Sequence, residues 1–167
     1  MKKILSLLLV LVMAVGCVFA MTSCSDEPEL DLNKAAAALH KNGYEVYSTS
    51  TDDAGVGNIL EAFKTEGGSK EFITIYECDS EATAKLYLRR FEAQYEAKLL
   101  ELESKIEHAE NMIDEYEDKL SAAEKSNYEK IIEECEAELE KYEDETAYGK
   151  SGTKVWYGTV AAIEATK

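Results

Sequence analysis

The fold is decided by residues 99–146, which read LLELESKIEHAENMIDEYEDKLSAAEKSNYEKIIEECEAELEKYEDET. In the first half of this stretch, apolar residues recur at alternating intervals of three and four: Leu99, Leu102, Ile106, Ala109, Ile113, Tyr116 and Leu120. The second half continues this spacing: Tyr128, Ile132, Cys135, Leu139 and Tyr142. In this second half, nearly every position between them is Glu, Asp or Lys. This repeat is typical of helices that pack along a coiled-coil seam, so each half is predicted to be such a helix.

The two seams lie on either side of residues 122–127, which predicts an antiparallel helical hairpin that folds back near residue 124. This register places Leu120 opposite Tyr128 and Ile106 opposite Tyr142. Each arm has about 20 residues and each residue adds about 1.5 Å, so the hairpin is expected to extend for roughly 30 Å. A projection of this kind offers a surface to a partner. It favours an interaction or structural function over a catalytic one.

The N-terminus is organised as a secretory signal peptide. Two lysines, Lys2 and Lys3, precede an apolar run from Ile4 to Ala20. Residues 21–24 then read MTSC, and the sequence becomes polar directly afterwards. This motif resembles the lipobox of bacterial lipoproteins. The resemblance implies that residues 1–23 are removed, that Cys24 is lipidated, and that the protein is anchored on the extracytoplasmic face of the bacterial cell membrane.

Other interpretations of this segment remain open. Cys17 follows Ala14-Val15-Gly16 and is a rival lipidation site, but cleavage there would leave a hydrophobic mature end. The apolar run could also be a retained anchor, or cleavage could follow Ala20 and release the protein. Residues 24–30 are expected to form a tether, and residues 31–167 a single domain that carries the hairpin at about 99–146.

The rest of the chain predicts a small α+β domain. A short helix is expected over residues 31–40. Strands are expected at residues 44–49, 59–65, 71–78 and 153–157, of which 59–65 could also be helical. A helix from residue 81 leads into the hairpin, and a last short helix follows Thr159. These elements predict an antiparallel sheet of three or four strands, with helices on one face.

The charge is strongly negative and unevenly distributed. The chain carries 34 acidic and 18 basic residues, a formal net charge of −16. Of these, 19 acidic and 6 basic residues lie between Glu96 and Thr146. Nucleic acid and anionic lipid surfaces would be repelled. We therefore expect membrane attachment only through the lipid on Cys24, and a protein partner at the hairpin, whose charge would suit a basic face.

Catalytic and metal-binding motifs are missing from the sequence, so no enzyme, metal site or cofactor is predicted. The remaining candidate site is an aromatic patch on the sheet, formed by Tyr44, Tyr47, Tyr76, Tyr148, Trp156 and Tyr157. The alternative function is therefore binding of a small ligand at this patch, with the hairpin as a spacer. Residues 43–46 (GYEV) and 155–159 (VWYGT) resemble segments of small uncharacterised lipoproteins of Gram-positive anaerobes. That resemblance implies no particular activity.

Overall fold

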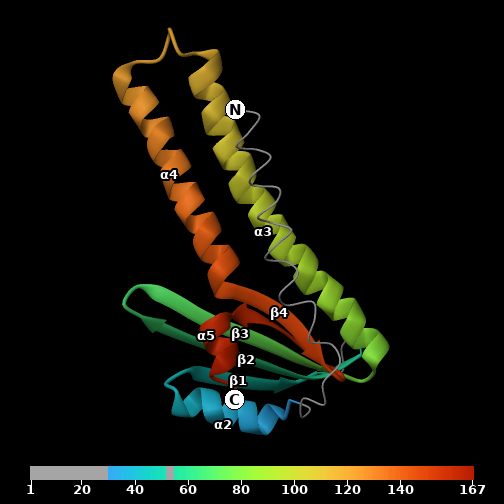
Figure 1. Ribbon diagram of the computed structural model, residues 1–167. Coiled ribbons are helices and arrows are strands. Elements are labelled where there is room, and N and C mark those ends of the chain that lie inside the picture. The colour runs from blue at the N-terminus through green and yellow to red at the C-terminus, as the bar shows by residue number, and fades with distance from the viewer. Residues whose placement is uncertain (1–29, 52–54) are drawn as a thin grey trace.

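The computed structural model describes residues 30–51 and 55–167 and contains one five-stranded antiparallel sheet with the strand order β1-β2-β3-β5-β4 (Figure 1). Its elements are α2 (Leu32–Lys41), β1 (Glu45–Ser50), β2 (Val56–Glu66), β3 (Ser69–Cys78), α3 (Glu81–Glu115), α4 (Ala122–Glu145), β4 (Thr146–Ser151), β5 (Lys154–Thr159) and α5 (Val160–Glu164). The predicted signal peptide, Cys24 and all of the predicted tether except Leu30 lie outside the described residues. The α+β class is confirmed.

Local chemistry explains where the first elements begin and end. The Asp31 side chain accepts hydrogen bonds from the backbone N–H groups of Asn33 (2.9 Å) and Lys34 (3.1 Å), which caps α2. After β2, both Gly67 and Gly68 have positive φ angles, of 59° and 87°. A two-residue loop of this conformation matches the twist of a β-hairpin, so β3 returns directly beside β2.

Helices cover both faces of the sheet, and the prediction that they cover one face only is wrong. On one face, α2 and α5 enclose a core whose buried residues are Ala35, Leu39, Tyr44, Leu60, Ala62, Ile73, Ile75 and Ala162. On the other face, the first half of α3 covers Val56, Cys78, Ala84, Phe91, Val155 and Tyr157. The central strand β3 carries apolar side chains on both faces: Ile73 and Ile75 lie on one, and Phe72 and Tyr76 on the other. Both faces therefore need a covering layer.

The sheet has five strands, not three or four, because β4 was not predicted. It begins at Thr146, immediately after α4, and pairs with β5 along its whole length. A Cβ atom at Gly149 would lie 2.7 Å from Cζ2 of Trp156, so the glycine leaves room for the indole ring across the strand pair. The second strand also begins earlier than predicted, at Val56, where a register shift between Val56 and Asn58 extends its pairing with β3.

The two long helices turn back earlier than the apolar spacing predicted. Helix α3 ends at Glu115, and α4 begins after Ser121 with a capping box formed by Ser121 and Glu124. The predicted turn near residue 124 therefore lies inside α4. Tyr142 was predicted to lie opposite Ile106, but its ring stacks on Tyr95. Tyr95 precedes Ile106 on α3 by about three helical turns. No helix among the described residues is long and apolar enough to cross a membrane.

Candidate functional site

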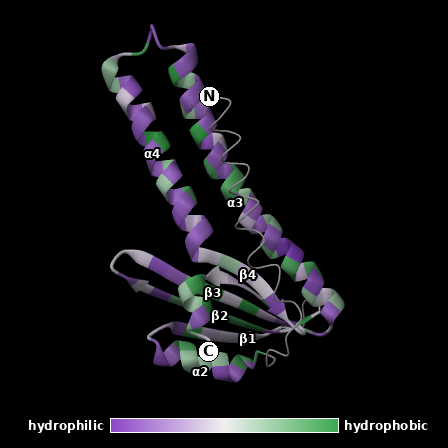
Figure 2. Cartoon of the chain, in the orientation of Figure 1, coloured by the Kyte–Doolittle hydropathy of each residue, from purple (hydrophilic) through white to green (hydrophobic). Residues whose placement is uncertain are grey.

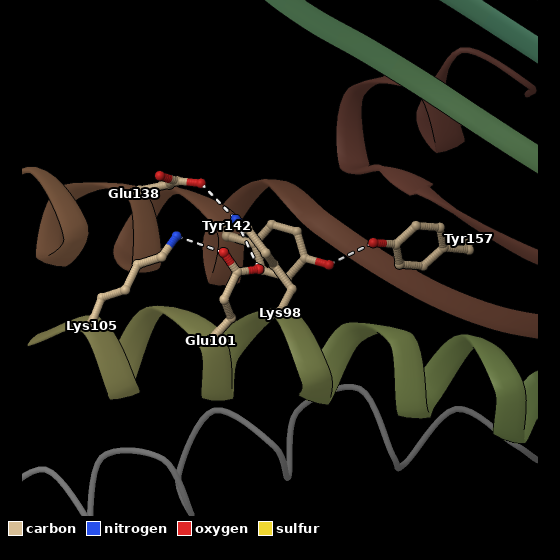
Figure 3. Close-up of polar contacts among 6 residues, drawn as sticks. All are labelled: Lys98, Glu101, Lys105, Glu138, Tyr142 and Tyr157. Atoms are coloured by element: carbon tan, nitrogen blue, oxygen red, sulfur yellow. Dashed lines mark hydrogen bonds and ion pairs between the residues drawn. The ribbon is translucent and has the colours of Figure 1, made fainter. Parts of the chain in front are cut away.

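The strongest candidate for a functional surface is the pair of long helices, α3 and α4, which extend away from the sheet (Figure 1). Contacts among Tyr95, Tyr142 and Tyr157 form the root of this pair. At this root the Tyr142 ring stacks on the Tyr95 ring, with centroids 5.2 Å apart and an angle of 25° between the planes. The Tyr142 hydroxyl lies 2.5 Å from the Tyr157 hydroxyl, so α4 is hydrogen-bonded to β5 (Figure 3). Burial and this hydrogen bond raise the pKa of Tyr142 above its usual value.

Further aromatic contacts fix α3 to the sheet. The Phe91 ring stacks on Tyr157 with centroids 5.6 Å apart, and it packs against Tyr76 at 5.3 Å. The Tyr87 ring meets Tyr76 edge-on at 5.0 Å. Tyr95 also contacts Tyr148, with centroids 5.5 Å apart. Rings in such tilted and stacked pairs stabilise their contact beyond the burial of apolar area, so the direction of α3 relative to the sheet is held from several sides.

Above the root, charged side chains connect the two helices. The Lys98 ammonium lies 3.0 Å from a carboxylate oxygen of Glu138 on α4 and 3.8 Å from one of Glu101 (Figure 3). Lys105 pairs with Glu101 at 2.6 Å on the same helix. These groups are largely exposed, so each pair contributes little to stability. The Lys98 and Glu138 pair joins the two helices, whereas Glu101 and Lys105 both belong to α3.

The seam between the helices follows the predicted apolar repeat over most of its length. Leu102 and Ala109 of α3 are buried, with 0% and 1% of their surface exposed. The α4 positions of the repeat are half-buried: Tyr128, Ile132, Cys135, Leu139 and Tyr142. Tyr116 departs from the prediction because it lies beyond the end of α3 and is 39% exposed. The repeat therefore identified the packed side of both helices, although it misplaced the turn.

One exposed side of α4, next to the seam, carries a row of carboxylates, and Figure 2 shows this helix as mainly hydrophilic. Glu129, Glu133, Glu136 and Glu140 recur every three or four residues and are all exposed. Among the described residues, no lysine or arginine forms an ion pair with any of these four. Like charges at this spacing repel one another and slightly destabilise a helix. Within residues 30–51 and 55–167, the negative charge of this row is therefore not neutralised by ion pairs.

The six aromatic residues predicted as a ligand patch do not form one surface. Tyr44 is buried and Trp156 packs against the core on the α2 and α5 side. Tyr76, Tyr148 and Tyr157 lie on the opposite face, where α3 covers them. Only Tyr47 is largely exposed, with 53% of its surface accessible. The division follows from strand alternation, which sends neighbouring residues such as Trp156 and Tyr157 to opposite faces.

The structure adds a partner for Tyr47 that the sequence analysis missed. The Phe63 ring on β2 stacks on Tyr47, with centroids 5.6 Å apart and an angle of 13° between the planes. Both residues lie in segments that were predicted as strands, at residues 44–49 and 59–65. The sequence did not show the register in which these two strands pair, and this register brings the two rings together. A depression of about 370 Å³ adjoins this pair and is lined by Gly43, Glu45, Phe63, Lys64, Thr65 and Glu66.

No group of three or more His, Cys, Asp and Glu side chains among residues 30–51 and 55–167 is placed to hold a metal ion. The comparisons with protein-family models, with curated proteins and with solved structures found no match for this chain.

Proposed function

We propose that this protein is a lipid-anchored, extracytoplasmic interaction module without catalytic activity, and that the α3–α4 pair is its contact surface. The observation that carries the proposal is the row of exposed carboxylates on α4 that form no ion pair with a described residue. The contacts of Tyr142 with Tyr95 and Tyr157 fix the orientation of this helix relative to the sheet. A flexible acidic segment would not need the ring stack of Tyr95 and Tyr142 or the hydroxyl contact to Tyr157. Rigid presentation is useful when a partner must meet the surface in a defined direction.

The chemistry of the surface points to a partner protein with a basic face. Nucleic acid would be repelled by this charge, as would an anionic lipid surface. We further propose that α3 and α4 pack as an antiparallel coiled coil beyond Lys98, in the register set by the Lys98 and Glu138 pair. In this arrangement the apolar repeat is used within the chain, and the charged positions remain available to the partner.

A shortened variant tests this function. Residues 103–134 are replaced by a four-residue glycine and serine linker, which keeps the root contacts of Tyr95, Lys98, Glu138 and Tyr142. Partners are captured from intact, cross-linked cells with the full-length protein and with the shortened variant, both retaining Cys24. We expect a specific partner that the shortened variant does not capture.

A second variant keeps the helices and changes only their charge. Glu129, Glu133, Glu136 and Glu140 are changed to Gln, and this variant should also lose the partner. Urea unfolding measured on both variants establishes that the sheet is still folded. Equal capture of the same partner by all three proteins would contradict the proposal, because the hairpin would then be a spacer.

Lipid anchoring through Cys24 has a separate test. Cells expressing the full-length chain are fed an alkyne fatty acid, and the protein is isolated and probed for the label. We expect the Cys24→Ser variant to lose the label and the Cys17→Ser variant to retain it. Loss of the label from Cys17→Ser alone would instead identify the rival lipidation site.

A further inference from the structure

Among the described residues, the helices leave part of one sheet face uncovered. On this face α3 covers β3, β5, β4 and the first part of β2, at Val56 and Ile59, while β1 and the rest of β2 extend beyond it. The strand register places four side chains on this open area in a square: Glu45 opposite Phe63, and Tyr47 opposite Glu61. The two rings occupy one diagonal of the square and the two carboxylates the other. The area is therefore an aromatic platform with a negative charge on each side.

The strand that borders this area is open along its outer edge. Among the described residues, β1 pairs with β2 alone, and it has neither proline nor lysine to block a further strand. Its six residues, Glu45–Ser50, span roughly 20 Å. An extended segment added beside β1 would place every second side chain on the face that holds Tyr47.

The charges on the open area select the chemistry of such a segment. Glu45 and Glu61 are exposed, and neither forms an ion pair with a described lysine or arginine. The Tyr47 hydroxyl donates a long hydrogen bond of 3.4 Å to Glu45, which leaves the carboxylate largely unsatisfied. A guanidinium or ammonium group can stack on an aromatic ring while it pairs with a neighbouring carboxylate. The net charge of −16 favours the approach of a basic chain.

We propose that the outer edge of β1 and the open face of β1 and β2 dock an extended basic segment of a partner protein, with its arginine or lysine side chains on the Tyr47 and Phe63 rings between Glu45 and Glu61. This docking site is separate from the α3–α4 surface and does not rest on the function proposed above. It gives the molecule two contact surfaces, one on the paired helices and one on the sheet edge.

The test measures binding of a defined peptide to the purified full-length protein. The probe is a fluorescein-labelled octapeptide of alternating arginine and threonine, and binding is followed by fluorescence anisotropy. The double variant Glu45→Gln with Glu61→Gln should weaken binding at least about tenfold, which corresponds to about 1.4 kcal/mol. The matched control, Glu81→Gln with Glu164→Gln at the start of α3 and the end of α5, removes the same charge from exposed positions outside both proposed surfaces and should change the dissociation constant less than about twofold.

A second pair of variants tests the aromatic platform. Tyr47→Ala should weaken binding severalfold, whereas Tyr116→Ala, at the far end of α3, should have no effect. Backbone amide shifts recorded by NMR should change on β1 and β2 when the peptide is added. The shortened variant that lacks residues 103–134 should bind the peptide as tightly as the full-length chain.

Three results would overturn the inference. The first is equal weakening by the Glu45 and Glu61 pair and by the Glu81 and Glu164 pair of glutamine substitutions, which would indicate a diffuse charge effect. The second is loss of peptide binding in the shortened variant alone, which would move the peptide to the paired helices and leave the function proposed for them intact. The third is amide shifts on β1 and β2 produced by a neutral oligosaccharide such as chitotetraose, with none produced by the peptide.

Discussion

Tyr142 connects the paired helices to the sheet through one hydroxyl group. Its contact with the Tyr157 hydroxyl is part-buried, and both burial and the hydrogen bond favour the neutral phenol, which raises the pKa of Tyr142. A phenol whose pKa is raised on folding holds its proton more tightly in the folded chain. Its contribution to stability is therefore complete below the unfolded pKa of about 10 and is lost as the pH rises above that value.

We expect the free energy of unfolding, measured by urea denaturation, to fall between pH 9.5 and pH 11.5. The Tyr142→Phe variant should lose less stability over this interval, because its side chain cannot ionise. At pH 7 the same variant should be about 1 kcal/mol less stable, since the Tyr157 hydroxyl loses its partner. Tyr116→Phe is the control, and its pH dependence should match that of the wild type. An identical alkaline slope in Tyr142→Phe and wild type would contradict the role given to this hydroxyl.

Gly158 is constrained by the strand beside it. A Cβ atom at this position would lie 2.4 Å from the Phe72 carbonyl oxygen and 2.7 Å from the Ile73 Cα, both of which are backbone atoms of β3. We expect Gly158→Ala to lower the free energy of unfolding by about 1–3 kcal/mol, because the central strands must separate. Gly57→Ala is the matched control, since its Cβ would meet Asp79 Oδ1 at an ordinary 3.5 Å. Equal stability of the two variants would show that the sheet yields more easily than this packing indicates.

Individual side chains show what the sequence could and could not reveal. The apolar repeat correctly marked Leu102 and Ala109 as buried, because helical periodicity is a local property. The grouping of Tyr44 with Trp156 and Tyr157 could not be resolved in the same way. The face that a strand residue occupies depends on its register with strands that are distant in sequence, and β5 is separated from β3 by both long helices.

At the scale of elements, the seam between α3 and α4 depends on a few fully buried side chains. Leu102 is completely buried, whereas Leu100, two residues earlier on the same helix, is 65% exposed. We expect Leu102→Ala to lower the free energy of unfolding by about 2–5 kcal/mol through the cavity it leaves. Leu100→Ala should change it by less than about 0.5 kcal/mol. Urea denaturation followed by circular dichroism measures both, and a similar effect of the two substitutions would contradict the observed seam.

The turn between the helices shows a competition between two sequence signals. The apolar repeat continues through Tyr116 and Leu120 and predicted that the first helix reaches residue 120. The capping box of Ser121 and Glu124 overrides it, because the Ser121 hydroxyl accepts a hydrogen bond from the Glu124 N–H (3.3 Å) and the Glu124 carboxylate accepts one from the Ser121 N–H (2.8 Å). The motif was legible in the sequence, and it sets the start of α4.

Strand β4 was missed for a different reason. Its residues, TAYGKS, have little intrinsic preference for extended structure as a group, since alanine, glycine and lysine are uncommon in strands. The strand also follows directly on the end of α4 and is followed by Gly152. The strand exists because β5 presents a full set of pairing partners and because the Trp156 ring lies against Gly149. Tertiary contacts thus create an element that no local pattern predicts.

For the whole molecule, the helices on the two faces of the sheet have different roles. Helices α2 and α5 close one core, while α3 closes the other with its first half and then continues away from the sheet with α4 (Figure 1). The long pair therefore shares a continuous helix with the core, so its direction is set by the sheet. A partner that binds the far end of the pair would meet a surface of fixed orientation.

We propose above that partner contact occurs on the paired helices and away from the sheet. Site-specific photo-crosslinking in intact cells tests it most directly, with benzoylphenylalanine introduced either at Tyr116, in the turn beyond α3, or at Leu86, near the start of α3. Both side chains are exposed in the free protein, at 39% and 50%, so both probes can react if a partner is close. We predict a protein adduct from position 116 and none from position 86. An adduct from position 86 alone would contradict it.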